Sequence, residues 1–78
     1  MDGLSKTRKA LAFNLKTLRG ERPREEVREA ARISQRTLEG LESAAPNSNP
    51  QLSTLLALSE AHGVSLSRLL EPPSDSDA

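Results

Sequence analysis

The sequence predicts an all-α domain of five helices, in which the second and third helices meet at a sharp turn. Composition favours helix over strand, because Leu and Ala dominate the apolar residues and Phe13 is the only aromatic residue. Apolar residues recur three or four positions apart along most of the chain, which is the spacing of one helix face. Gly, Pro and Asn residues divide these periodic stretches into segments of helical length.

Composition also limits what can stabilise the fold and which functions to expect. The chain has 78 residues, enough for one domain with a small core, and it has no Cys and a single His. We therefore expect no disulfide, no metal site and no cofactor. No apolar run approaches the length of a membrane span, and the residues after Met1 do not form the apolar core of a signal peptide. A soluble intracellular protein is expected, with no membrane partner.

Charge is unevenly distributed along the chain, although the formal net charge is zero. Residues 1–36 contain ten Lys or Arg and five acidic residues, whereas residues 37–78 contain one Arg and six acidic residues. This asymmetry indicates a basic face on the N-terminal half, as a polyanion partner requires. A mixed-charge surface that keeps a small domain in solution would give a similar pattern.

The first helix is predicted from about Ser5 to Arg19, and Gly20 ends it. The folded domain is placed at residues 8–71, between a flexible arm (residues 1–7) and a disordered acidic tail (residues 72–78). Phe13 lies off the apolar stripe of this helix. We expect it to pack at the edge of the core, with a dimer contact as the alternative. The stripe itself consists of Leu11, Leu15 and Leu18.

The stretch from Arg24 to Ser43 predicts two short helices joined at a turn near residues 32–34. Ser34 is a favourable N-cap for the second of them, and Leu38 and Leu41 fall on its inner face. Its opening residues are then largely outward, at the N-terminal end of a helix with a polar edge. A helix-turn-helix uses this arrangement to place side chains in a DNA major groove. The outward residues are Gln35, Arg36, Thr37, Glu39 and Gly40.

Two further helices follow the loop at residues 44–50. Asn49 is expected to cap the fourth helix and Pro50 to occupy its first position. Gly63 ends this helix, and Ser65 caps a short fifth one. The two helices are predicted to supply much of the core, through Leu52, Leu55, Leu56, Leu66 and Leu69.

These segments, in this order, resemble the Cro/cI-type (Xre-like) helix-turn-helix regulators of phages and bacteria. The resemblance covers about residues 8–70. It is most specific in NPQLSTLLALSEAHGVSLSRLL, residues 49–70, and LKTLR, residues 15–19, resembles the end of the family's first helix. The resemblance implies a lambda-repressor-like fold, with the helix-turn-helix at helices 2 and 3.

Site roles follow from the resemblance, position by position. It implies base contacts, in which Gln pairs with adenine and Arg with guanine, and it implies contacts with phosphates from residues around the reading helix. The expected base contacts are Gln35, Arg36, Thr37 and Glu39. The expected phosphate contacts are Arg24, Arg22, Ser34, Ser43 and Asn47.

The resemblance also implies an internal ion pair between Arg19 and Glu42, which would be structural. Three departures from the family pattern affect the helix-turn-helix. Arg28 stands where the family prefers Ala, Arg32 replaces the usual turn Gly, and Gly40 removes one expected base contact. A left-handed Arg at the turn would cost about 1 kcal/mol more than Gly.

The function that this resemblance implies is sequence-specific binding of double-stranded DNA by a transcriptional repressor. An antitoxin-type autoregulator, or a protein-interaction module that kept the fold and lost DNA binding, are the alternatives. No enzyme is expected, since no Ser or Thr has a base nearby in sequence and His62 is expected to cap a helix end or fill the surface. Family members dimerise, so we expect a weak homodimer or a dimer formed on DNA. A bacterial or phage-encoded protein of this kind is expected in the cytoplasm, at the nucleoid.

Overall fold

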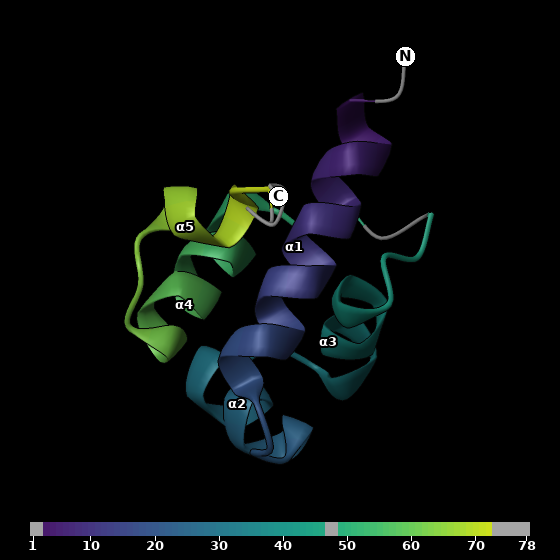
Figure 1. Cartoon of the computed structure of the whole chain (residues 1–78). Helices are drawn as coiled ribbons and strands as arrows, with labels where there is room; N and C mark the ends of the chain where they lie inside the picture. The colour runs from purple at the N-terminus through teal and green to yellow at the C-terminus, as the bar shows by residue number, and fades with distance from the viewer. Residues whose placement is uncertain (1–2, 47–48, 73–78) are drawn as a thin grey trace.

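The computed structural model describes residues 3–46 and 49–72, and in these ranges it contains five α-helices and no strand. This confirms the predicted all-α fold of five helices. The two helices of the expected helix-turn-helix have the predicted bounds, and Asn47 and residues 73–78 lie outside the described residues. The helices are α1 (Gly3–Arg19), α2 (Arg24–Ala31), α3 (Gln35–Glu42), α4 (Leu52–His62) and α5 (Leu66–Leu70) (Figure 1).

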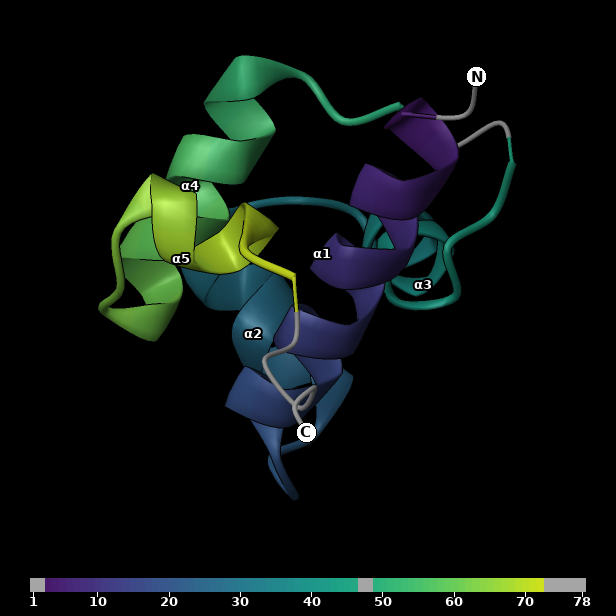
Figure 2. The same cartoon turned by 45° about the horizontal axis from the view of Figure 1, so that its top comes forward.

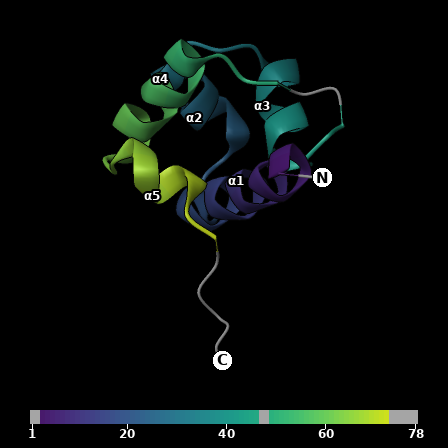
Figure 3. The same ribbon diagram turned by 90° about the horizontal axis from the view of Figure 1, so that it is seen from above.

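The long helix α1 contacts both α3 and α5, while α2 contacts α3 and α4 (Figure 2). Because α4 also contacts α5, the described helices surround one common core, as the view from above shows (Figure 3). Burial of this apolar surface is the main stabilising contribution available to a small domain without disulfides. The core consists of Leu11, Leu15, Val27, Ala31, Leu38, Leu41, Leu58 and Leu69.

Side-chain caps define the starts of two helices, as the sequence predicts. The Ser34 Oγ accepts a hydrogen bond from the Thr37 N–H at 3.0 Å at the start of α3. The Ser65 Oγ accepts one from the Arg68 N–H at 3.2 Å at the start of α5. Each cap satisfies a backbone donor that has no partner within its own helix.

The turn between α2 and α3 depends on a left-handed residue. Arg32 ends α2 with φ 59° and ψ 46°, and the Ile33 N–H donates to the Arg28 carbonyl at 3.1 Å. This bond across the end of a helix is the Schellman arrangement, in which glycine is the usual left-handed residue. Ala44 has φ 55° after α3, and there the Ala45 N–H donates to the Gly40 carbonyl at 3.1 Å.

A buried amide fastens α5 to α1. The Asn14 side chain is 3 % exposed, and its Nδ2 donates to the backbone carbonyls of Leu69 at 2.7 Å and Glu71 at 2.8 Å. The Arg68 carbonyl lies 3.3 Å from the same nitrogen. Asn14 therefore satisfies carbonyls at the end of α5 that the helix itself leaves without donors.

The helix boundaries differ from the prediction in two places. Helix α1 begins at Gly3, two residues before its predicted start at Ser5, so part of the expected arm (residues 1–7) is helical. Helix α4 begins at Leu52, after an extended Gln51 that makes no side-chain cap. Asn49 does not cap this helix, because its Oδ1 accepts a hydrogen bond from Arg8 Nη2 at 3.0 Å.

Three apolar residues expected in the core are on the surface instead. Leu52 and Leu56 are 69 % and 49 % exposed, because they share the outer face of α4 while Leu58 faces the core. Phe13 is 50 % exposed on α1, which corrects its expected packing at the core edge. Leu55 is partly buried and packs against the core as predicted.

The described residues contain no helix with both the length and the apolar character needed to span a membrane.

Candidate nucleic-acid interface

Helix α3 is anchored by its apolar face and leaves a polar edge in solvent. Leu38 is fully buried and Leu41 is 2 % exposed, so the orientation of the helix about its axis is fixed. The residues between and before these two leucines are consequently turned outward. Gln35, Arg36, Thr37 and Glu39, the expected base contacts, are all exposed.

Two of these exposed side chains bind each other. Gln35 Nε2 donates to Glu39 Oε2 at 2.8 Å, one helical turn further along. This bond orients the amide of Gln35. Thr37 is bound locally, since its Oγ1 accepts from Ser34 Oγ at 2.8 Å. Arg36 forms no ion pair with any residue in the described part of the chain.

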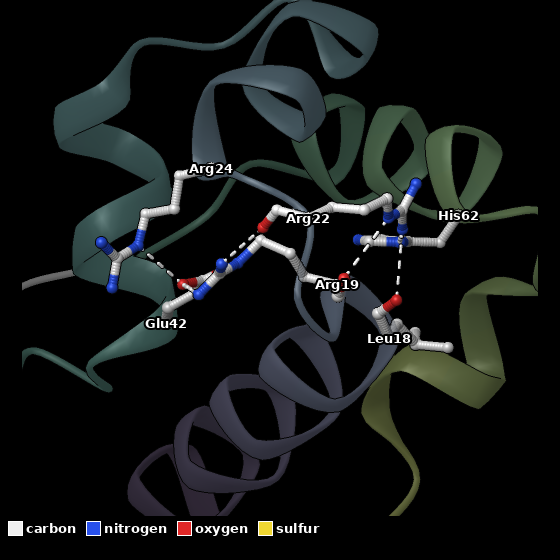
Figure 4. Close-up of polar contacts among 6 residues, drawn as sticks. All are labelled: Leu18, Arg19, Arg22, Arg24, Glu42 and His62. Atoms are coloured by element: carbon white, nitrogen blue, oxygen red, sulfur yellow. Dashed lines mark hydrogen bonds and ion pairs between the residues drawn. The ribbon is translucent and has the colours of Figure 1, made fainter.

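A buried carboxylate lies behind this exposed edge and joins three helices. The Glu42 side chain is 2 % exposed, and its Oε2 and Oε1 accept from Arg19 Nε at 2.8 Å and Nη2 at 3.0 Å. The predicted pair of Arg19 and Glu42 is therefore present. Arg24 Nε also donates to Glu42 Oε1, at 2.9 Å, so two guanidinium groups share one carboxylate (Figure 4).

This pairing controls the charge of both partners. Burial favours the neutral acid of Glu42, but hydrogen bonds and charges from Arg19 and Arg24 outweigh it, so the pKa of Glu42 is lowered. The hydrogen bond to Glu42 raises the pKa of Arg19, despite the opposing effect of burial. Glu42 is thus held ionised between two cations, and the three side chains carry a net charge of about one unit positive.

Arg22, an expected phosphate contact, is half-exposed and binds the end of α1 and His62. Its Nη2 donates to the Leu18 carbonyl at 3.1 Å and its Nε to the Arg19 carbonyl at 3.3 Å, at the end of α1. The same Nη2 lies 3.1 Å from His62 Nδ1 (Figure 4). Arginine is only a donor, so Nδ1 accepts and the His62 proton resides on Nε2.

These surroundings favour the neutral form of His62. Burial lowers its pKa, the charge of Arg22 lowers it further, and Glu42 opposes the shift. Its Nε2 is buried and makes no hydrogen bond to a described residue. His62 was expected to be a helix cap or surface residue, but it contacts the connection between α1 and α2.

A shallow hollow lies beside α3, toward the segment that leads into α4. Its volume is about 540 Å³, and Gly40 is one of its lining residues. Ser43 lies at its edge, with Oγ donating to the Gly40 carbonyl at 3.2 Å. Its polar lining residues include Arg36, Thr37, Glu39, Ser43 and Asn49.

The structure therefore gathers most of the predicted site residues at one end of α2 and along α3. Arg24, Ser34 and the exposed edge of α3 lie around the helix-turn-helix, whereas Arg22 points elsewhere. Sequence reasoning missed the contact between Arg24 and Glu42, which joins positions 18 apart. It also missed Asn14, although a signal existed: Asn14 lies in the same helical stripe as Leu11 and Leu18.

Comparison with known proteins gives a match in fold. No protein-family model and no curated protein sequence matches the chain. The chain is similar to a crystal structure described as a hypothetical transcription factor, NHTF, from Neisseria, with a TM-score of 0.79 and 23 % sequence identity. The match covers 96 % of this chain and 86 % of that one. The five helices of the described residues form an architecture that is consistent with the predicted lambda-repressor-like fold.

Proposed function

We propose that this chain is a sequence-specific double-stranded DNA-binding regulator of the Cro/cI type, which acts as a transcriptional repressor. The observation that carries the proposal is the exposed polar edge of α3, held in place by the buried Leu38 and Leu41. Similarity in fold to a structure described as a hypothetical transcription factor supports it. Such a role belongs to the cytoplasm, at the nucleoid.

In this proposal α3 enters the major groove with its N-terminal turn leading. Arg36 pairs with a guanine, and the amide of Gln35, oriented by Glu39, pairs with an adenine. Glu39 is also able to accept from the amino group of a cytosine, and Thr37 contacts a thymine methyl or a phosphate.

The phosphate contacts of the proposal centre on Arg24, whose side chain is 45 % exposed at the start of α2. Ser34 and Ser43 flank α3 and are exposed, so they are placed to contact the backbone on either side of the groove. Arg22 contributes positive charge from a distance, because its guanidinium is bound to α1 and His62.

A single reading helix recognises only a few base pairs, which is too little to find one site in a genome. We therefore propose that two copies bind a two-fold repeated site, as a weak dimer or a dimer formed on the DNA. The exposed ring of Phe13 is a candidate contact between the copies. Light scattering during titration with a site-bearing duplex would show two chains per duplex, whereas one chain at saturation would rule out the dimer.

Selection of bound sequences from a random duplex pool tests the function. We expect one preferred sequence to emerge for the unaltered protein. Arg36→Ala should cost about 1–3 kcal/mol on that sequence and relax the preference at one or two base pairs. The control Arg68→Ala, an exposed Arg on α5, should leave the preference unchanged.

The outcome that would contradict the proposal is the absence of both enrichment and salt-dependent binding to duplex DNA. That result would favour a protein-interaction module with the same fold. Control of an operon that also encodes a toxin would identify the antitoxin-type autoregulator instead.

A further inference from the structure

The guanidinium of Arg24 has an inner and an outer edge. Its Nε donates to Glu42 Oε1 at 2.9 Å. Within the described residues, this is the only hydrogen bond that the Arg24 side chain makes. The two terminal nitrogens lie on the side away from Glu42, as Figure 4 shows. They make no hydrogen bond to any residue within 3–46 or 49–72, so both can donate to a ligand.

Glu42 is also held by contacts that do not involve Arg24. Its side chain is 2 % exposed, and Arg19 binds both of its oxygens. Arg19 is fixed in turn, because its Nη1 donates to the Arg22 carbonyl at 2.8 Å. The carboxylate is therefore a fixed point on α3 against which the exposed Arg24 side chain is aligned.

We propose that Glu42 is a positioning residue for DNA binding: it holds the inner edge of Arg24 so that the outer edge forms a ready pair of donors for one backbone phosphate. This inference rests on the proposed function. Arginine suits such a role, since its planar fork serves two acceptors on different edges at once. A side chain already aligned loses less conformational entropy when the phosphate binds.

The inference and simple electrostatics predict opposite changes in DNA affinity when Glu42 is neutralised. Glu42 is an anion close to the proposed DNA surface, so its neutralisation by Glu42→Gln should tighten DNA binding if charge alone matters. If Glu42 positions Arg24, the same substitution should weaken binding. We expect the dissociation constant to rise about tenfold, the order expected for loss of one charge-assisted hydrogen bond.

The measurement is fluorescence anisotropy of a labelled mixed-sequence duplex, titrated with protein over a series of salt concentrations. Glu42→Gln is compared with the unaltered protein, with Arg24→Ala and with the double variant. The positioning role predicts coupling: Glu42→Gln weakens binding when Arg24 is present and does not weaken it in the Arg24→Ala background. A purely structural role would weaken binding equally in both backgrounds.

A second variant keeps the test decisive if Glu42→Gln does not fold, which circular dichroism would show. Arg24→Lys retains the positive charge and leaves the Arg19–Glu42 pair in place. The lysine side chain has one nitrogen in place of the three of a guanidinium. This nitrogen cannot present one edge to Glu42 and another to the phosphate, so the two contacts compete. We expect severalfold weaker duplex binding, whereas the control Arg68→Lys on α5 should bind like the unaltered protein.

Besides equal weakening by Glu42→Gln in the two backgrounds, two further results would overturn the inference while leaving the proposed function intact. One is a folded Glu42→Gln variant that binds duplex as tightly as the unaltered protein or more tightly. The other is an Arg24→Lys variant with unaltered affinity and salt dependence. Failure of the unaltered protein itself to bind duplex in a salt-dependent manner would instead refute the proposed function.

Discussion

Among the described residues, two that carry side chains adopt the left-handed backbone conformation that glycine accepts most easily. Arg32 has φ 59° between α2 and α3, and Ala44 has φ 55° after α3. Gly63 occupies the equivalent position after α4, where the Val64 N–H donates to the Ser59 carbonyl at 3.0 Å. The same hydrogen-bonded helix end thus occurs with a glycine once and with a strained residue twice.

This strain predicts that glycine stabilises the fold at both positions. Arg32→Gly and Ala44→Gly should each raise the free energy of unfolding by up to about 1 kcal/mol, since relief of the left-handed strain exceeds the added entropy of the unfolded chain. Urea denaturation would measure the change. Gly63→Ala is the matched control, because an added Cβ meets no atom within 4 Å there and only the backbone strain remains. It should destabilise, and a loss of stability in both glycine variants would contradict the explanation.

At the scale of the element, α4 is apolar on more than one face. Leu58 is fully buried, whereas Leu56 is 49 % exposed only two residues away. Apolar periodicity identifies a helix, but it does not identify the inner face when Leu and Ala extend around most of the circumference. For this reason the prediction that Leu52 and Leu56 belong to the core was wrong, while the existence of the helix was predicted correctly.

Substitution of leucines within α4 tests the assignment of its faces. Leu58→Ala should cost about 2–5 kcal/mol, because it leaves a cavity in a fully packed core. Leu56→Ala removes an exposed side chain, so we expect a change within about 0.5 kcal/mol. Thermal unfolding of both variants measures the difference. Similar losses of stability in Leu58→Ala and Leu56→Ala would show that the outer face of α4 is covered.

Local signals allowed α2 and α3 to be predicted from the sequence, but not the start of α4. Ser34 caps α3 with its own side chain, three residues from the amide that it binds, and such a pattern is visible in any sequence. The side chain of Asn49 is instead bound by Arg8, which is 41 positions away. No pattern within the loop indicates that competing partner, so α4 was expected to begin too early.

At the scale of the whole molecule, the junction of α1, α2 and α4 contains a titratable group that the fold keeps neutral. His62 Nδ1 accepts from Arg22 Nη2, and burial followed by the charge of Arg22 lowers the pKa of His62 below its ordinary value of 6.5. The unfolded chain therefore binds a proton in a range of pH where the folded chain does not.

Stability should consequently fall as the pH falls below 6.5, because the contribution of neutral His62 is complete above that value and is lost toward the lower pKa of the folded state. Thermal midpoints measured from neutral pH to just above the range where carboxylates titrate would show this slope. His62→Gln offers Arg22 a non-titrating acceptor, so the slope should disappear in this variant. An unchanged slope would assign the pH dependence to other groups.

The candidate interface could be predicted from the sequence only in part, for a reason that lies in the whole fold. The exposed edge of α3 follows from the spacing of Leu38 and Leu41, which the sequence displays directly. The contact between Arg24 and Glu42 exists only because α1, α2 and α3 converge around one buried carboxylate. In the family that the sequence resembles, the acidic residue matched by Glu42 pairs with one Arg, matched here by Arg19. The resemblance therefore gave no reason to expect Arg24 as a second partner.

The amide of Asn14 has a consequence for the exchange of backbone hydrogens with solvent. A helix as short as α5 ordinarily opens and closes freely, and its amide protons are then replaced quickly by deuterium. Here Asn14 donates to the Leu69 and Glu71 carbonyls, while the Leu69 side chain is fully buried. Separation of α5 from α1 would expose this buried amide, so α5 opens only when the core opens. Its hydrogen-bonded amide protons should exchange about as slowly as those in the middle of α1, and Asn14→Ala should release those of α5 first.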